Sequence, residues 1–199
     1  MWAGLTFAAF VALAFLDTRA WDSLITGGFQ QVPSWPLYRA ASAITVFGSV
    51  QLTVALIFWV AWAAGRRSGT SVACWMVLPF LGLVFLELLL KLVGPYVRPG
   101  MLLRPSGVVW AWFRVPPSYS FPSGHMLRAT YLVGLLLTWE AETRNGPRGP
   151  LVFWPLTAIA LAVFGISQVY LGNHWASDVA GGFLLAASWA LAASPHWKW

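Results

Sequence analysis

The chain has 199 residues, of which 59% are hydrophobic and only 9% are charged, and its mean hydropathy is +0.69. Because about a quarter of the residues in an average soluble domain are charged, this composition excludes an ordinary soluble protein and predicts an integral membrane protein. The net charge is +6, and most of the basic residues lie in the connections between apolar runs. We therefore expect the protein to contact anionic lipid headgroups and not nucleic acid. The single cysteine, Cys74, excludes an intramolecular disulfide and a metal–thiolate cluster.

Six apolar runs predict an all-α, polytopic membrane protein with six transmembrane helices in one bundle, formed by a single domain over residues 1–199. A helix needs about 20 residues to cross the hydrocarbon layer. The first run has no basic region before it and no small-residue cleavage site, so we expect a retained helix rather than a signal peptide. The predicted spans are residues 1–16, 40–64, 70–94, 121–139, 151–171 and 174–193.

Two of the connections are long and contain helix-breaking residues. Residues 17–39 include two glycines and two prolines, which we expect to break any long helix and leave a connection along the membrane surface: Gly27, Gly28, Pro33 and Pro36. Residues 95–120 are rich in proline and arginine, so most of this segment cannot form a helix that faces lipid.

If each predicted span crosses the membrane once, four separate parts of the chain lie on the same side of the membrane. They are the end of the third span, the start of the fourth, the end of the fifth and the start of the sixth. We therefore predict an active site at one membrane face, built from Lys91, Arg98, His125, His174 and Asp178.

Basic residues on the opposite side favour a cytoplasmic location for that side. They are Arg66, Arg67, Arg144, Arg148 and Lys198. The active site would then face away from the cytoplasm. A compact chain rich in Ala, Arg, Gly and Trp further indicates a bacterial cell membrane as its location.

The chemistry of the predicted site begins with His174 and Asp178, which are four residues apart. On a helix they share one face, so the carboxylate can hold one ring nitrogen and leave the other free to attack. Alone, such a pair is more simply a buried histidine satisfied by an acid. A second histidine, His125, and nearby cations instead indicate a phosphate ester as substrate. His174 would form a phosphohistidine, and His125 would protonate the leaving oxygen and then activate water.

The phosphate itself would be bound by cations and by a helix start. Lys91 and Arg98 are expected to hold its non-bridging oxygens, with Glu87 four residues before Lys91 as the partner that orients it. Ser123 and Gly124 follow a proline where a helix begins, so their backbone N–H groups would face the same anion. These cations would repel a metal ion, and we therefore expect neither a metal site nor a cofactor.

Three stretches of the chain resemble, in order, the three signatures of the type 2 phosphatidic acid phosphatase family. Lys-x6-Arg-Pro corresponds to residues 91–99, Pro-Ser-Gly-His to residues 122–125, and Ser-Arg-x5-His-x3-Asp to residues 167–178. The resemblance implies a hydrolase that removes phosphate from a membrane lipid without a metal ion, often on the extracytoplasmic face. Candidate substrates are a polyprenyl diphosphate, phosphatidylglycerol phosphate, phosphatidic acid and a phosphorylated glycolipid.

One residue departs from the family pattern, because Gln168 stands where the third signature has arginine. Losing a charge-assisted contact to phosphate would cost roughly 1.5–3 kcal/mol, or about one to two decades in rate or affinity. Arg128, three residues after His125, is our hypothesis for a replacement cation; the alternative is an arginine that extends to the membrane interface. Two other functions remain open: a weakly active or inactive protein that binds or transports lipid phosphate, and a phosphotransferase that uses the same histidine.

Overall fold

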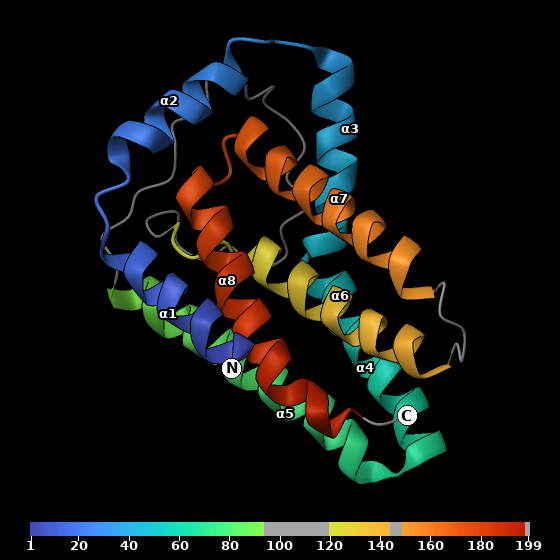
Figure 1. The fold of residues 1–199 in the computed structure, drawn as a ribbon. Coiled ribbons are helices and arrows are strands. Elements are labelled where there is room, and N and C mark those ends of the chain that lie inside the picture. The colour runs from blue at the N-terminus through green and yellow to red at the C-terminus, as the bar shows by residue number, and fades with distance from the viewer. Residues whose placement is uncertain (94–119, 144–148, 198–199) are drawn as a thin grey trace.

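The computed structural model describes residues 1–93, 120–143 and 149–197, and the secondary structure of this part of the chain consists of helices joined by short turns (Figure 1). The expected all-α architecture is therefore confirmed for the described residues. The helices are α1 (Trp2–Phe15), α2 (Arg19–Gln30), α3 (Trp35–Thr45), α4 (Val50–Ser68), α5 (Thr70–Val93), α6 (Gly124–Thr143), α7 (Gly149–Tyr170) and α8 (Ala176–Ala193). Two short 3-10 turns, η1 (Val46–Gly48) and η2 (Ser194–His196), lie before α4 and after α8.

Candidate membrane spans in the described residues number two to four, judged by helix length and hydropathy. Thr70–Leu92 in α5 and Ala176–His196 in α8 and η2 each qualify alone. The pairs α1 with α2 and α3 with α4 qualify if each bent pair is one span, with bends of 93° and 43°. The apolar part of α7, Trp154–Tyr170, is shorter. Helices α5 to α8 occupy the positions of the last four predicted spans, while the total of six remains a prediction.

The predicted second span, residues 40–64, is not one continuous helix. The chain leaves the helical conformation at Ser49 (φ −63°, ψ 145°), whose Oγ accepts a hydrogen bond from the backbone N–H of Leu52 at 3.4 Å and so caps α4. Immediately before it, Gly48 is packed so closely that a Cβ there would overlap the ring of Phe164. The break leaves backbone carbonyl groups without helical partners, which becomes important at the functional site.

The segment from residue 17 to residue 39 also differs from its prediction, because it contains all of α2 and the first part of α3. Gly27 and Gly28 lie within α2 and do not interrupt it. The turn after α2 contains Pro33, and Ser34 then caps α3 by accepting a hydrogen bond from the N–H of Leu37 at 3.5 Å. Glycine lowers helix stability by only about 1 kcal/mol, so tertiary contacts of α2 readily outweigh it.

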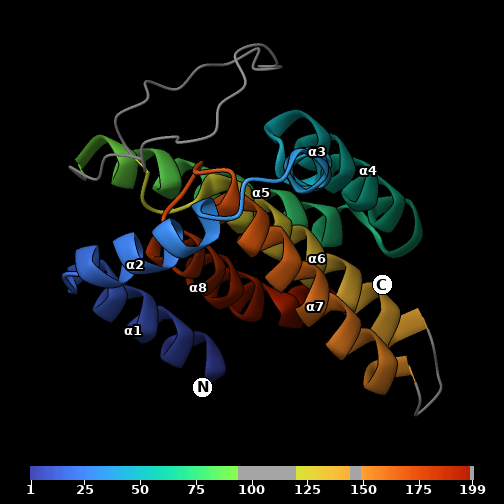
Figure 2. The same cartoon turned by 90° about the horizontal axis from the view of Figure 1, so that it is seen from above.

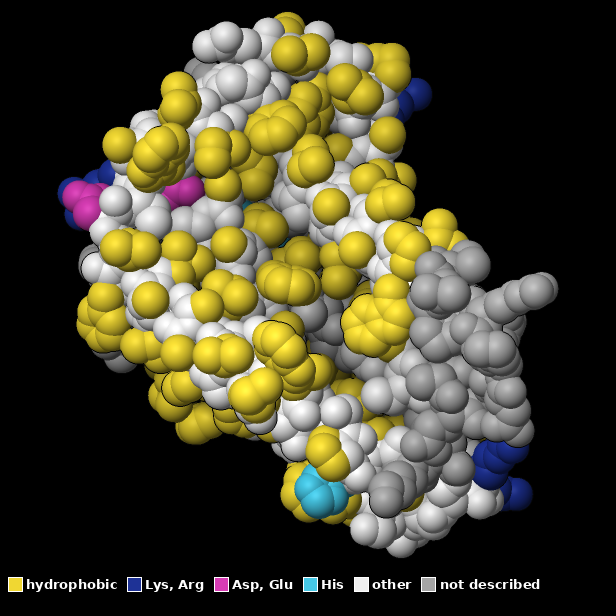
Figure 3. All heavy atoms as spheres, in the orientation of Figure 1, with side chains coloured by type: hydrophobic (Ala, Val, Ile, Leu, Met, Phe, Trp, Pro, Cys, Tyr) yellow, Lys and Arg dark blue, Asp and Glu magenta, His cyan; other side chains and the backbone are white. Residues whose placement is uncertain are grey.

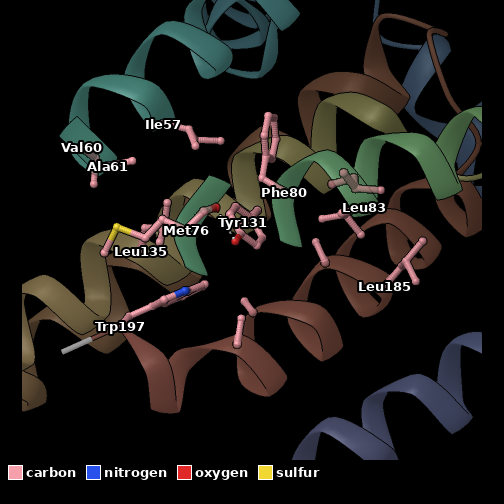
Figure 4. Close-up of a cluster of buried hydrophobic side chains, with 14 of the residues drawn as sticks. Ile57, Val60, Ala61, Met76, Phe80, Leu83, Tyr131, Leu135, Leu185 and Trp197 are labelled. Carbon is pink, nitrogen blue, oxygen red and sulfur yellow. Dashed lines mark hydrogen bonds between the residues drawn. The ribbon is translucent and has the colours of Figure 1, made fainter. Parts of the chain in front are cut away.

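The core lies where α4, α5, α6 and α8 meet, and it closes with the tail after α8. Figure 4 shows side chains from these helices converging on Tyr131 of α6, whose hydroxyl donates a hydrogen bond to the Met76 carbonyl at 2.9 Å. From the tail, Trp197 packs edge-on against Tyr131 and donates from Nε1 to the Trp75 carbonyl at 2.8 Å. Seen from above in Figure 2, α8 lies between α1 on one side and α6 with α7 on the other.

Large apolar side chains also cover much of the outer surface, as Figure 3 shows for one face. Phe15, Trp21, Leu24, Trp62 and Phe85 are each more than 60% exposed. A soluble protein rarely exposes so much contiguous apolar surface, whereas a bilayer solvates it well.

Candidate active site

The turn between α7 and α8 carries His174, and its shape follows from one glycine. Gly172 has φ +65°, a left-handed conformation that ends α7 in the way glycine commonly ends helices. The next two backbone N–H groups, of Asn173 and His174, both donate to the Gln168 carbonyl, at 3.1 and 3.4 Å. The imidazole of His174 is thereby directed inward and is only 2% exposed.

Asp178 orients this histidine from the first turn of α8. Its Oδ2 accepts a hydrogen bond from the backbone N–H of Trp175 at 2.8 Å, and the same oxygen lies 3.5 Å from His174 Nδ1. That separation exceeds the usual hydrogen-bond range of about 2.7–3.2 Å. A small movement of the turn would therefore be enough to form a hydrogen bond between His174 and Asp178. The predicted pairing is present, but His174 precedes α8, which begins at Ala176. The two residues meet through the helix cap and not through a shared helical face.

His125 approaches His174 from the first turn of α6. The two ring centroids are 6.2 Å apart, and the ring planes are inclined at 59°. The starts of α6 and α8 beside them are held together by a hydrogen bond from the backbone N–H of Ser123 to the carbonyl of Asp178, at 2.9 Å. Two titratable rings and one carboxylate from distant parts of the sequence therefore share one site.

The same hydrogen bond corrects one expectation about phosphate binding. The N–H of Ser123 donates to Asp178 and does not face an anion, while Ser123 Oγ accepts from the Met126 N–H at 3.4 Å as a helix cap. Gly124, the first residue of α6, has a packing role in addition to its expected N–H donor. A Cβ at this position would overlap Glu87 Oε1, so only glycine lets α6 start so close to that carboxylate.

A buried ionic cluster connects α5 with α6 beside the histidines. Glu87 Oε1 accepts from Lys91 Nζ at 2.5 Å, and Oε2 accepts from Arg128 Nη1 at 3.0 Å. Arg128 Nε donates to the carbonyl of Gly48 at 3.3 Å, in the break between α3 and α4. The three charged residues are 3%, 8% and 6% exposed, for Glu87, Lys91 and Arg128 respectively.

This arrangement bears on one of the two interpretations of Arg128. The guanidinium is buried against Glu87 and does not extend to a membrane interface, so that alternative is wrong. The cluster has two cations and one carboxylate, which leaves a single net positive charge for a phosphate. Direct contact between Arg128 and phosphate remains a prediction, and Arg98 lies outside the described residues.

Gln168, the departure from the family pattern, is completely buried in the last turn of α7. Its Oε1 accepts from Asn173 Nδ2 at 3.3 Å, whereas its Nε2 has no hydrogen-bond partner among the described residues. A buried donor without a partner costs about 1–3 kcal/mol and calls for an explanation. An oxygen of a bound phosphate would supply the missing acceptor.

Sequence reasoning missed Asp22, an acidic residue of α2 that is only 6% exposed. Its Oδ1 accepts from the backbone N–H of Ser177 at 2.8 Å, and its Oδ2 accepts from the hydroxyl groups of Ser177 and Thr18, at 2.5 and 2.7 Å. A signal was available, because Asp22, Thr26 and Gln30 repeat every four residues on one face. Within the described residues, no three His, Cys, Asp or Glu side chains are grouped as metal ligands.

Comparisons with known proteins agree on one family. The profile of the PAP2 superfamily matches residues 72–199. An undecaprenyl-diphosphatase from Sulfolobus acidocaldarius is 37% identical over 95 residues, which cover 47% of this chain and 36% of that protein, so the match spans about a third of the relative's length. The crystal structure of a transmembrane PAP2-type phosphatidylglycerolphosphate phosphatase from Bacillus subtilis superposes with a TM-score of 0.78 at 23% identity, over 97% of this chain and 94% of that one. The fold is thus that of an integral membrane protein.

Proposed function

Because the chain belongs to the PAP2 superfamily, we propose that it is a metal-independent phosphatase that removes phosphate from a membrane lipid through a phosphohistidine intermediate. The observation that carries this proposal is the facing pair of histidines, 6.2 Å apart between ring centroids, with Asp178 beside one of them. A nucleophile, its orienting carboxylate and a proton donor are the groups that two-step phosphoryl transfer needs.

In the first step, Nε2 of His174 attacks phosphorus while Asp178 stabilises the proton on Nδ1. The bond between phosphorus and the lipid oxygen breaks, and His125 gives that oxygen a proton. In the second step, His125 takes a proton from water as the water oxygen attacks the phosphohistidine. Inorganic phosphate leaves, and both histidines return to their starting states.

The phosphate oxygens would be held by positive charge and by hydrogen-bond donors. Lys91 and Arg98 supply charge, with Lys91 oriented by Glu87. Nε2 of Gln168, which has no acceptor in the described part of the chain, and the N–H of Gly124 at the start of α6 supply neutral donors. Arg128 of α6, which pairs with the same Glu87 carboxylate, adds a second positive charge to the cluster. The cation that the family has at position 168 in α7 is thus replaced by one in α6.

The membrane arrangement that fits this site has six spans in one domain, with each bent pair, α1 with α2 and α3 with α4, crossing once. All the proposed site residues then lie at one face, and Arg66 and Arg67, in the last turn of α4, lie at the other, cytoplasmic face. We place the active site at the extracytoplasmic face of a bacterial cell membrane.

The substrate class follows from the membrane setting and from the relatives. One similar protein is named for undecaprenyl diphosphate and the other for phosphatidylglycerol phosphate, and both are anionic lipids with a terminal phosphate. We propose a polyprenyl diphosphate or a phospholipid phosphate as the substrate of this chain.

Phosphate release by purified protein tests the proposal. Undecaprenyl diphosphate, phosphatidylglycerol phosphate and phosphatidic acid in detergent micelles are compared by malachite green, with His174→Ala as the blank. We expect phosphate release from at least one lipid and no release by His174→Ala. An acid-labile phosphoprotein should be found when hydrolysis by wild type is stopped early. Equal release by wild type and His174→Ala would refute the mechanism.

Gln168 supports one competing function, a protein that binds lipid phosphate with little or no turnover, because a charge is missing from the site. Binding of the three lipids without phosphate release would establish that function instead. Release of a phosphorylated alcohol in the presence of glycerol would identify a phosphotransferase.

A further inference from the structure

Helix α2 buries a row of polar side chains and exposes large apolar ones. Asp22, Thr26 and Gln30 are 6%, 3% and 9% exposed, whereas Trp21 and Leu24 are 70% and 68% exposed. A helix on the surface of a water-soluble protein shows the opposite pattern. The outward face therefore suits lipid, and the inward face lies against the ends of α7 and α8, across which α2 runs in Figure 1.

The main polar contact is the carboxylate of Asp22 at the start of α8. One oxygen accepts from the Ser177 N–H, a group that has no partner within the helix, and the other accepts from the Ser177 and Thr18 hydroxyl groups. The negative charge is also favoured at this helix end by the helix dipole. Two of these three bonds come from Ser177 and one from Thr18, so Asp22 links the start of α2 to the first turn of α8.

That turn is the one on which the reaction depends. Ser177 immediately precedes Asp178, whose carboxylate caps Trp175 and lies 3.5 Å from His174. A displacement well below 1 Å changes this contact from a hydrogen bond to a long ion pair. Misplacement of a reacting group by about 1 Å can lower a rate about 100-fold.

We propose that Asp22 is a positioning residue for the reaction: by binding Ser177, it holds Asp178 and His174 in their reactive arrangement. The inference rests on the proposed role of His174 as nucleophile. It also assigns a function to α2, a helix outside the matched family region, which begins at residue 72.

Asp22→Asn is the central variant, because it preserves shape but loses an acceptor for the two hydroxyl groups. Asp17→Asn is the matched control, since its carboxylate is 79% exposed and its contacts given by the described residues are with the neighbouring Arg19. Ser177→Ala removes the hydroxyl from the other side of the contact, and keeps the proposal testable if Asp22→Asn does not fold. His174→Ala reports on the proposed function.

The readouts are binding of orthovanadate, a phosphate analogue that bonds to nucleophilic histidine, and kcat and KM for phosphatidic acid. Titrations use the full chain in detergent and follow tryptophan fluorescence. We expect wild type and Asp17→Asn to bind vanadate equally, and Asp22→Asn and Ser177→Ala to bind it about tenfold more weakly. In these last two variants kcat should fall at least about tenfold, while KM stays within about threefold of wild type. A smaller folded fraction lowers kcat but leaves the vanadate dissociation constant unchanged.

The vanadate results distinguish a failure of the positioning role of Asp22 from a failure of the proposed function on which it rests. If Asp22→Asn and Ser177→Ala bind vanadate as wild type does while His174→Ala does not, the positioning role is wrong and the proposed nucleophile stands. If wild type binds no better than His174→Ala and releases no phosphate, both are wrong.

Discussion

Glu87 is shared by two buried cations, and its removal should destabilise the protein strongly. In Glu87→Gln the amide oxygen can still accept from one of Lys91 and Arg128, but the charge is lost and the other cation stays buried. Removing one partner of a buried ion pair costs about 3–5 kcal/mol. Because one hydrogen bond survives, we expect a loss at the low end, about 3 kcal/mol. For a chain of this size, that loss corresponds to a Tm lower by roughly 6–12 °C.

Thermal unfolding in detergent, followed by tryptophan fluorescence, measures this loss in Glu87→Gln, Arg128→Gln and the double variant. Since the two side chains are in contact, the double variant should lose less stability than the sum of the single variants, by about 1 kcal/mol or more. Asp17→Asn removes an exposed acid and should leave Tm unchanged. If the losses of stability in the two single variants simply add in the double variant, the ion-pair cluster is wrong. It is also wrong if the Tm of Glu87→Gln lies within 2 °C of wild type, a difference that corresponds to about 0.5–1 kcal/mol of unfolding free energy.

Further predictions concern the site itself. Gly124→Ala should lower Tm and abolish phosphate release, because the added Cβ would overlap Glu87. Gly4→Ala is the control, since Gly4 has open space around it and the variant should behave as wild type. Normal activity in Gly124→Ala would contradict the packing. Gln168→Leu should raise KM about tenfold or more by removing a donor to phosphate, and an unchanged KM places phosphate elsewhere. Phosphate release should persist in excess EDTA, and a loss restored by one divalent metal would refute the metal-independent mechanism.

The sequence by itself determined the helical class, the family and the approximate positions of α5 to α8. These properties are local: hydropathy along ten to twenty residues reports on burial in lipid, and the three signatures are read directly from adjacent residues. The spacing of Glu87 and Lys91 likewise predicted their ion pair, because residues four apart meet on any helix.

Contacts between distant residues were beyond this reasoning. The hydrogen bond from the Ser123 N–H to the Asp178 carbonyl removed an expected phosphate donor, and Arg128 acquired two partners, Glu87 and Gly48, from separate helices. Asp22 and Ser177 are 155 residues apart, and nothing in either local pattern identifies the other.

Tertiary structure also decided where the helices break and how the catalytic pair is formed. Ser49 interrupts the predicted second span, where it caps α4, and the adjoining Gly48 packs closely against Phe164, a residue of α7. His174 meets Asp178 in a capped turn before α8, although the same spacing is equally compatible with one continuous helix. Spacing determines which residues can meet, but only packing determines the conformation in which they do, because several backbone arrangements satisfy one sequence separation.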